Sequence, residues 1–251
     1  MLATSTSVFN PYFLFSAFLI GFLPVLIWLF FWLSEDRQKP EPRSLIFSTF
    51  VLGMLSVFLA YFLESFLRSP SLDLIGWTGW LTTLPYLNMA IVEEVVKFSI
   101  IAFIIGRNRH LDEPIDAMVY MITVALGFAS MENMLFLLNS LAEKEAVSMF
   151  LFTGGLRFLG STILHTVCSA VIGVGWALTF YQGARRRIFA TLTALVIAIA
   201  LHTAFNFLII MSGGQMMLPI LVALWVAVFF ILFLFELVKR IKTKTNFANN
   251  L

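Results

Sequence analysis

Cysteine, histidine and charged residues are all scarce in this sequence. Its 251 residues include one cysteine and three histidines, and only 12% of them are charged. The single cysteine, Cys168, cannot form a disulfide within the chain. The basic residues stand in short clusters beside apolar runs and form no extended patch, so we expect no nucleic-acid partner. What the sequence has in abundance is apolar side chains, at 60% of the residues, and a mean hydropathy of +0.95.

Apolar runs long enough to cross a bilayer recur along the whole chain. A hydrocarbon core about 30 Å thick is crossed by roughly 20 apolar residues in a helix. Lipid offers the backbone no hydrogen-bond partners, so each run is expected to be helical. The sequence therefore predicts an all-α, polytopic membrane bundle of about seven transmembrane helices, in a single integral membrane domain over residues 1–251. The expected spans are 11–33, 45–67, 83–105, 115–138, 151–180, 188–211 and 218–237.

Lysine and arginine are divided unevenly among the connections between these spans. Of the 16 basic residues, twelve follow odd-numbered spans, and only Arg68 and Lys144 follow even-numbered ones. By the positive-inside rule, this places the N-terminus outside and the C-terminus in the cytoplasm. The first residues have no basic cluster and the next apolar run is too long for a signal peptide, so we expect no cleavage. The expected location is the cell membrane, as a multi-pass protein surrounded by the lipid bilayer.

The third predicted span carries three ionisable residues near its middle, Glu93, Glu94 and Lys97, in the motif EEVVK. A charged group at the bilayer centre costs about 2.5–3.5 kcal/mol, so these groups are expected to pair, meet water or serve a function. Glu93 and Lys97 are four residues apart and share a helix face, so we expect them to compensate each other in part. Glu94 lies about 100° further round the helix and needs another partner. A structural ion pair that fixes helix packing is the alternative to a functional site.

The next three predicted spans carry polar residues as well. They are Glu132 and Asn133 in the fourth span, Arg157, Ser161 and His165 along one face of the fifth, and His202 and Asn206 one turn apart on the sixth. A rise of about 1.5 Å per residue places Glu93, Glu132, His165 and His202 in one layer, at or outward of the bilayer midplane. A shared water-filled cavity in that layer would explain why the membrane tolerates them.

Carboxylates and histidines around a membrane cavity suit the transfer of a proton from water. One of Glu93 and Glu94 would act as general base, while Lys97 holds the other ionised. His202 and Asn206 would donate hydrogen bonds to the oxyanion that forms when water attacks a peptide carbonyl.

The same groups also suit a metal. Zinc takes histidine nitrogen and carboxylate oxygen ligands, and a catalytic zinc keeps one position open for water. Glu132, His165 and His202 would be its three ligands, with Glu93 as the base. The cofactor is therefore unknown from the residues alone, with zinc as the candidate, and both routes lead to hydrolysis.

Four motifs in this order resemble the PrsW-type intramembrane proteases, relatives of the CAAX prenyl endopeptidases in the Abi superfamily. They are EEVVK, the segment LDEPIDAMVYMITVALGFASMEN, STILHTVCSAVIG and LHTAFNF. The resemblance covers about residues 83–210, which would be the catalytic helices. It implies an intramembrane endopeptidase that cleaves a membrane protein on the extracytoplasmic side. Site-1 cleavage of a single-pass protein such as an anti-sigma factor is the implied activity.

The resemblance also implies roles for single residues. The paired-glutamate motif matches Glu93 and Glu94, and Glu93 is the better match to the carboxylate that activates water. The HxxxN motif matches His202 and Asn206, with the oxyanion role.

Two positions depart from the pattern of the CAAX-type relatives. Lys97 stands where they have arginine, and Glu132 stands where they have the histidine that holds water. His165 or Glu132 would then position the water or bind the metal, with Lys97, Asn133 and Arg157 in support.

Two other classes of function remain open at this point. Intramembrane glutamates and histidines also serve proton-coupled transporters, although the odd number of spans and the absence of an inverted repeat speak against one. A non-catalytic receptor or immunity protein on the same scaffold would keep the helices and use the cavity for binding.

Overall fold

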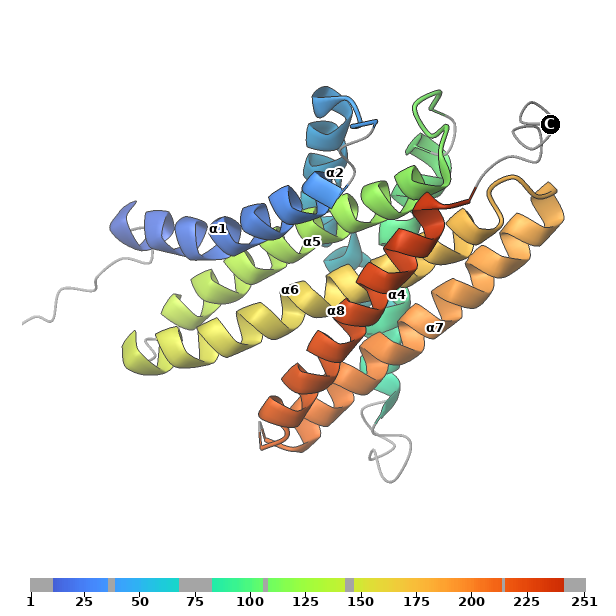
Figure 1. Cartoon of the computed structure of the whole chain (residues 1–251). Coiled ribbons are helices and arrows are strands. Elements are labelled where there is room, and N and C mark those ends of the chain that lie inside the picture. The colour runs from blue at the N-terminus through green and yellow to red at the C-terminus, as the bar shows by residue number, and fades with distance from the viewer. Residues whose placement is uncertain are drawn as a thin grey trace, which may run out of the picture.

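The computed structural model describes residues 11–35, 39–67, 83–105, 108–142, 147–213 and 215–241. These residues form one helical bundle, and no strand occurs among them (Figure 1). The helices are α1 (Pro11–Glu35), α2 (Arg43–Leu67), α4 (Leu84–Ile100) with its π-helical continuation η2 (Ile101–Ile105), α5 (Pro114–Ala142), α6 (Val147–Leu178), α7 (Ala184–Met211) and α8 (Met217–Lys239). The predicted all-α class is confirmed.

Within the described residues, six helices are long and apolar enough to cross a membrane. The six segments are Phe18–Glu35, Arg43–Leu67, Pro114–Asn139, Gly160–Leu178, Ala184–Met211 and Met217–Lys239. Helix α4 forms where the third span was predicted, but it has 17 residues and carries Glu93, Glu94 and Lys97. The protein is therefore a multi-pass membrane protein with at least six membrane-capable helices.

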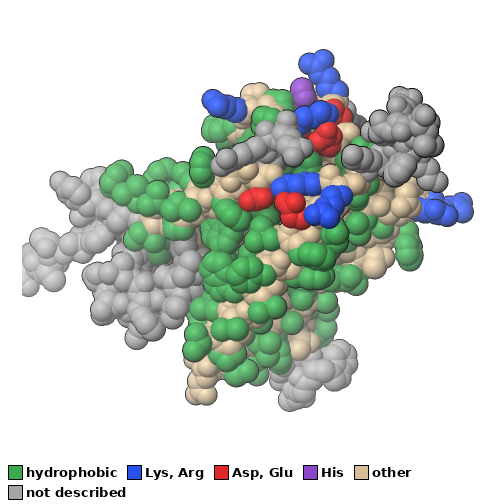
Figure 2. All heavy atoms as spheres, viewed as in Figure 1, with side chains coloured by type: hydrophobic (Ala, Val, Ile, Leu, Met, Phe, Trp, Pro, Cys, Tyr) green, Lys and Arg blue, Asp and Glu red, His purple; other side chains and the backbone are tan. Residues whose placement is uncertain are grey.

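Many large apolar side chains of the described helices are exposed. Figure 2 shows hydrophobic side chains across most of the visible face, with charged side chains gathered toward one end. Two ion pairs join chain segments that connect or end helices: Lys39 lies 2.5 Å from Glu113, and Lys239 lies 3.3 Å from Glu35. This division between an apolar body and a charged end is what a bilayer and its aqueous border require.

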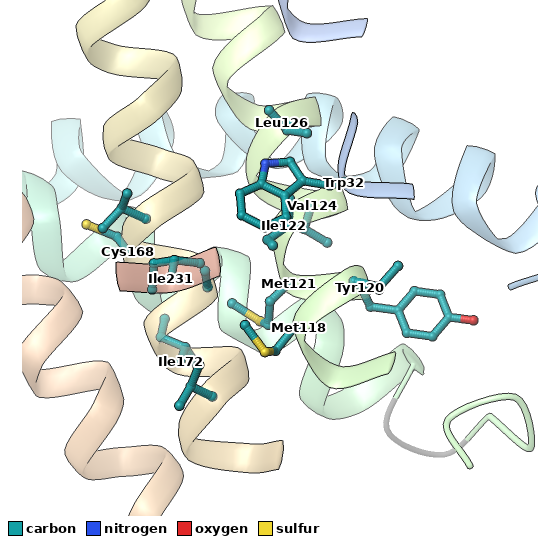
Figure 3. Packing of buried hydrophobic residues seen from close by; sticks show 14 of the residues in the cluster. Trp32, Met118, Tyr120, Met121, Ile122, Val124, Leu126, Cys168, Ile172 and Ile231 are labelled. Carbon is teal, nitrogen blue, oxygen red and sulfur yellow. The ribbon is translucent and has the colours of Figure 1, made fainter. Parts of the chain in front are cut away.

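Helix α5 lies at the centre of the core. It packs against α1, α2 and α6, and its side chains are buried along most of its length. Figure 3 shows members of the core cluster, among them Met118 and Ile122 of α5, Trp32 of α1, Ile172 of α6 and Ile231 of α8. Since lipid is as apolar as these side chains, the helices associate through close packing and hydrogen bonds rather than by leaving water.

Glycines let α2 and α6 approach α5 backbone to backbone. A Cβ atom on Gly53 of α2 would overlap the carbonyl oxygen of Val124, and one on Gly127 of α5 would overlap that of Phe50. On α6, a Cβ atom on Gly173 would come within 2.7 Å of the Cα atom of Met118. These contacts hold α5 between α2 and α6, as small residues do at membrane helix crossings. Helix α4 packs in turn between α2 and α7.

Candidate active site

The ionisable residues of the membrane helices meet in one buried cluster. Glu93, Glu94 and Lys97 of α4, His165 of α6 and His202 of α7 are each at most 4% exposed. On α4 these residues occupy the helix face that turns into the bundle, where an amphipathic helix would normally carry apolar side chains. The helix therefore buries its polar face, and the neighbouring helices must supply the partners.

Glu94 is bonded from two sides. The Lys97 ammonium donates to Glu94 Oε1 at 2.6 Å, and His202 Nδ1 lies 2.8 Å from the same oxygen. The carboxylate that pairs with the Lys97 ammonium is ionised and can only accept, so Nδ1 of His202 carries the proton. The expected pair of Glu93 with Lys97 is not formed. Lys97 can reach a residue three or four positions before it on the helix. His202 contacts the Glu94 carboxylate on the inner side of α4, and Lys97 binds the same carboxylate there.

His165 is held at both ring nitrogens. Its Nδ1 lies 2.9 Å from the Lys97 ammonium, which can only donate, so Nδ1 accepts. Its Nε2 lies 2.9 Å from Glu132 Oε2 and therefore donates. Ser161 Oγ donates to the same Glu132 oxygen at 3.1 Å. Glu132, whose side chain is 17% exposed, fixes the imidazole from its outer side.

Glu93 lies between the two imidazoles. Its Oε2 atom is 3.8 Å from His165 Nδ1 and 3.8 Å from His202 Nε2, and it forms no hydrogen bond within the described part of the chain. A buried carboxylate oxygen without a partner is costly and rare in proteins. Its position marks the point where a water molecule, a substrate group or a metal would bind.

The donor atoms around Glu93 fit a metal. Glu93, His165 and His202 each offer one ligand atom, and these atoms lie within 4.8 Å of one another. Both imidazoles turn their other nitrogen toward a carboxylate, Glu132 or Glu94, as metal-binding histidines commonly do. Glu132, which we expected as a third ligand, lies on the outer side of His165 instead. The Lys97 ammonium occupies His165 Nδ1 and would have to turn away before a metal could bind there.

The other expected residues lie around this cluster. Asn133 Nδ2 donates to Thr162 Oγ1 at 3.1 Å and so ties α5 to α6 beside Glu132. Asn206 is half-buried one turn beyond His202, and the structure shows it in no hydrogen bond with a described residue. Arg157 belongs to α6, but its side chain lies outside the described residues.

Sequence reasoning assigned no role to Phe128. The centroid of its ring lies 5.0 Å from the Lys97 ammonium and 5.3 Å from the centroid of the His165 ring. Phe128 therefore covers the cluster from α5. The chain has 28 phenylalanines, and spacing does not single this one out, because Phe136 also lies four residues from Glu132. Ser161 was expected on the His165 face, but its bond to Glu132 depends on how α5 and α6 pack.

Membrane helices that converge on a buried carboxylate between two oriented imidazoles provide the groups that hydrolysis within a membrane needs. Residues 41–235 match the model of the family described as PrsW family intramembrane metalloprotease, so the chain belongs to this family. The protein is an intramembrane endopeptidase of the cell membrane, and the transporter and receptor alternatives are not favoured.

Curated relatives agree over most of the chain. The chain is 27% identical to Protease PrsW of Geobacillus kaustophilus over 214 residues, which cover 84% of this chain and 88% of the relative. It is 27% identical to Protease PrsW of Bacillus subtilis over 82% of this chain and 88% of the relative. It is 26% identical to Protease PrsW of Clostridioides difficile, over 78% of this chain and 79% of the relative. No solved structure matches the chain.

Proposed function

We propose that peptide hydrolysis depends on Glu93 and that Glu94 serves to orient His202. One observation carries this proposal: Glu93 Oε2 is buried, lacks a hydrogen bond to any described residue, and lies 3.8 Å from each of two imidazoles. A water molecule beside that oxygen would lose its proton to Glu93 as it attacks a peptide carbonyl. Glu94 is a poor base because its Oε1 atom already accepts hydrogen bonds from Lys97 and His202.

Glu132, Ser161 and Lys97 are positioning residues in this proposal. Glu132 accepts from His165 Nε2 and from Ser161, and Lys97 donates to His165 Nδ1 and to Glu94. Together they hold the His165 ring so that one nitrogen faces Glu93. Held in advance, the ring needs no reorientation when substrate arrives.

Where a metal is bound, we propose that Glu93, His165 and His202 hold it, with zinc as the candidate. These residues supply the oxygen and nitrogen donors that zinc takes, and their outer hydrogen bonds support them. A zinc ion bound there would acidify water and polarise the peptide carbonyl. This set replaces Glu132 with Glu93, because Glu132 lies beyond the His165 ring.

In the chemistry without a metal, His202 and Asn206 are proposed to stabilise the oxyanion. Because His202 donates Nδ1–H to Glu94, its Nε2 donates to an oxyanion only when the ring is protonated. The Asn206 amide, one turn further on α7, donates without titrating.

We also propose a seven-span topology with the N-terminus outside, over a single domain of residues 1–251 with catalytic helices at 83–210. Residues Leu84–Ile105 form α4 and η2, which at about 1.5 Å per residue extend roughly 33 Å. That length crosses a hydrocarbon core, and the three ionisable side chains of α4 face inward. The distribution of lysine and arginine supports the orientation.

The substrate is proposed to be a single-pass membrane protein such as an anti-sigma factor, cut first on the extracytoplasmic side. In the proposed topology, α4 begins and α7 ends outside. Glu93 is nine residues from the start of α4, and His202 is nine residues from the end of α7, so both lie about 14 Å from the outer helix ends. This depth is outward of the midplane of α7 and supports cleavage near the outer surface.

The test compares Glu93→Gln with Glu236→Gln in proteoliposomes that contain a single-pass reporter. Glu236 is an exposed carboxylate of α8 and serves as the matched control. We expect Glu93→Gln to lower the cleavage rate by about 10²–10⁴-fold, the usual worth of a general base, and Glu236→Gln to leave it unchanged. Wild-type cleavage by a folded Glu93→Gln variant would overturn the proposal.

Metal content separates the two chemistries. Zinc is measured in wild-type protein and in a His165→Ala/His202→Ala variant, together with cleavage in the presence and absence of chelator. The metal site is supported if the wild-type protein contains stoichiometric zinc, the variant contains none, and chelator stops cleavage. Cleavage by metal-free protein supports a glutamate-dependent protease in which the histidines position water.

A further inference from the structure

A groove opens between α1 and α2, away from the active site. Both helices pack against α5 but make almost no direct contact with each other. The space between them has a volume of about 800 Å³, within the range of small-molecule binding sites. Its walls are apolar side chains from Phe22 to Leu33 on α1 and from Ile46 to Met54 on α2.

The depth of the groove matches one leaflet of a bilayer. Phe22 and Leu33 are eleven residues apart on α1, and Arg43 and Met54 are eleven apart on α2, so each wall extends about 16 Å. A hydrocarbon core of about 30 Å gives each leaflet roughly 15 Å. Phe30 in the wall is 73% exposed, so the groove is open to the surrounding lipid. In a bilayer aligned with these helices, the groove would extend from the membrane border to about the midplane.

Polar lining occurs at one end of the groove only, where it comprises Ser34, Glu41 and Arg43. The Glu41 carboxyl accepts a hydrogen bond from the Tyr120 hydroxyl, and burial raises the pKa of Glu41. Nearby, Lys39 is already paired with Glu113. Arg43 is exposed and forms no ion pair with any residue that the structure describes. The polar end therefore presents the exposed Arg43 guanidinium beside the Glu41 carboxyl, which lies against the Tyr120 hydroxyl and near Asp112 and Asp116.

We propose that this groove binds an anionic phospholipid, with an acyl chain between α1 and α2 and the phosphate at Arg43. A guanidinium donates two parallel hydrogen bonds to phosphate, which gives the contact both strength and direction. A zwitterionic lipid carries its own cation beside the phosphate and gains less from Arg43. Basic pockets between membrane helices at a cytoplasmic border bind acidic headgroups by the same chemistry.

The headgroup contact is tested by native mass spectrometry of the full chain in nanodiscs that contain equal amounts of dioleoyl phosphatidylglycerol and dioleoyl phosphatidylcholine. We expect one phosphatidylglycerol to remain bound per chain. Arg43→Gln should lower its retention by about tenfold or more, the loss expected for one charge-assisted pair. Arg185→Gln, which removes an exposed arginine of α7 outside the groove, should leave retention unchanged.

The acyl-chain contact is tested with a matched pair of substitutions on α1. Leu26 lines the groove, whereas its neighbour Ile27 does not, and both are exposed, at 46% and 63%. Leu26→Trp fills the groove and should remove the bound lipid. Ile27→Trp adds the same bulk to the outer face and should not.

Three results would overturn the proposal. One is equal retention of the two lipids with no effect of Arg43→Gln, which would mean ordinary surrounding lipid only. Another is equal lipid retention by the Leu26→Trp and Ile27→Trp variants. The third is that a photo-cross-linker at Val51 captures the single-pass reporter instead of lipid. That result would make the groove a docking site for a substrate helix.

Discussion

Lys97→Met removes the ammonium that lies 2.6 Å from Glu94 and 2.9 Å from His165, while it keeps a long flexible side chain. The Lys97 and Glu94 side chains are both 0% exposed. Removing one partner of a buried ion pair typically costs about 3–5 kcal/mol, because the other charge stays buried without compensation. Glu94 keeps His202 at 2.8 Å, so we expect a loss near the lower limit, about 3 kcal/mol of unfolding free energy.

The assay is equilibrium unfolding by denaturant titration in mixed micelles. Lys39→Met is the control, because its pair with Glu113 is exposed at 64% and 34% and should be worth at most about 1 kcal/mol. The double variant Glu94→Gln/Lys97→Met removes both charges and should lose less than Lys97→Met alone.

Two outcomes would refute this reasoning. Lys97→Met could unfold at the wild-type free energy, which would mean that Glu94 does not depend on the ammonium. The double variant could instead lose the sum of the two single variants, which would mean that the charges do not interact.

Three further predictions concern other parts of the chain. Glu132→Gln should lower the cleavage rate by about 10–100-fold, and Ser161→Ala should lower it less, because both residues act on catalysis through the orientation of His165. Cleavage by Glu132→Gln at the wild-type rate would contradict this. Gly127→Ala should cost about 1–3 kcal/mol in the same unfolding assay because its Cβ overlaps a backbone oxygen of α2, whereas Gly183→Ala, with open space around it, should be close to neutral. The raised pKa of Glu41 means that the folded state holds its proton more tightly than the unfolded state. The unfolding free energy of the wild type, relative to that of Glu41→Gln, should therefore fall as the pH rises above about 4.5, the ordinary pKa of a glutamate carboxyl. Unfolding titrations of both proteins between pH 4 and 8 measure this difference.

The helices were predictable because their apolar runs are uninterrupted. The run predicted at 45–67 forms α2 (Arg43–Leu67), and the run predicted at 188–211 forms α7 (Ala184–Met211). The residues by which these helices exceed the predicted runs, Arg43 and Ser44 in α2 and 184–187 in α7, are mostly polar or basic. A hydropathy pattern excludes them, although the helix continues through them. Depth along each helix was equally accessible, because a fixed rise per residue converts sequence position into height.

Contacts within the cluster were not predictable. Spacing allows Lys97 to reach either Glu93 or Glu94, and the choice depends on His202, more than a hundred residues further along the chain. Likewise, Glu132 reaches the outer nitrogen of His165 only because of the way α5 packs on α6. Sequence spacing gives the face of a helix but not its rotation against its neighbours, which decides between partners a few ångströms apart.

The hydrogen bonds of the site run without a break from Ser161 through Glu132, His165, Lys97 and Glu94 to His202. This chain of contacts passes through four helices, so it exists only when all four have assembled correctly. A newly inserted or partly opened chain has the same residues but not their arrangement. If these groups carry hydrolysis as proposed, a misassembled copy would lack their orientation and would leave the other proteins of the membrane uncut.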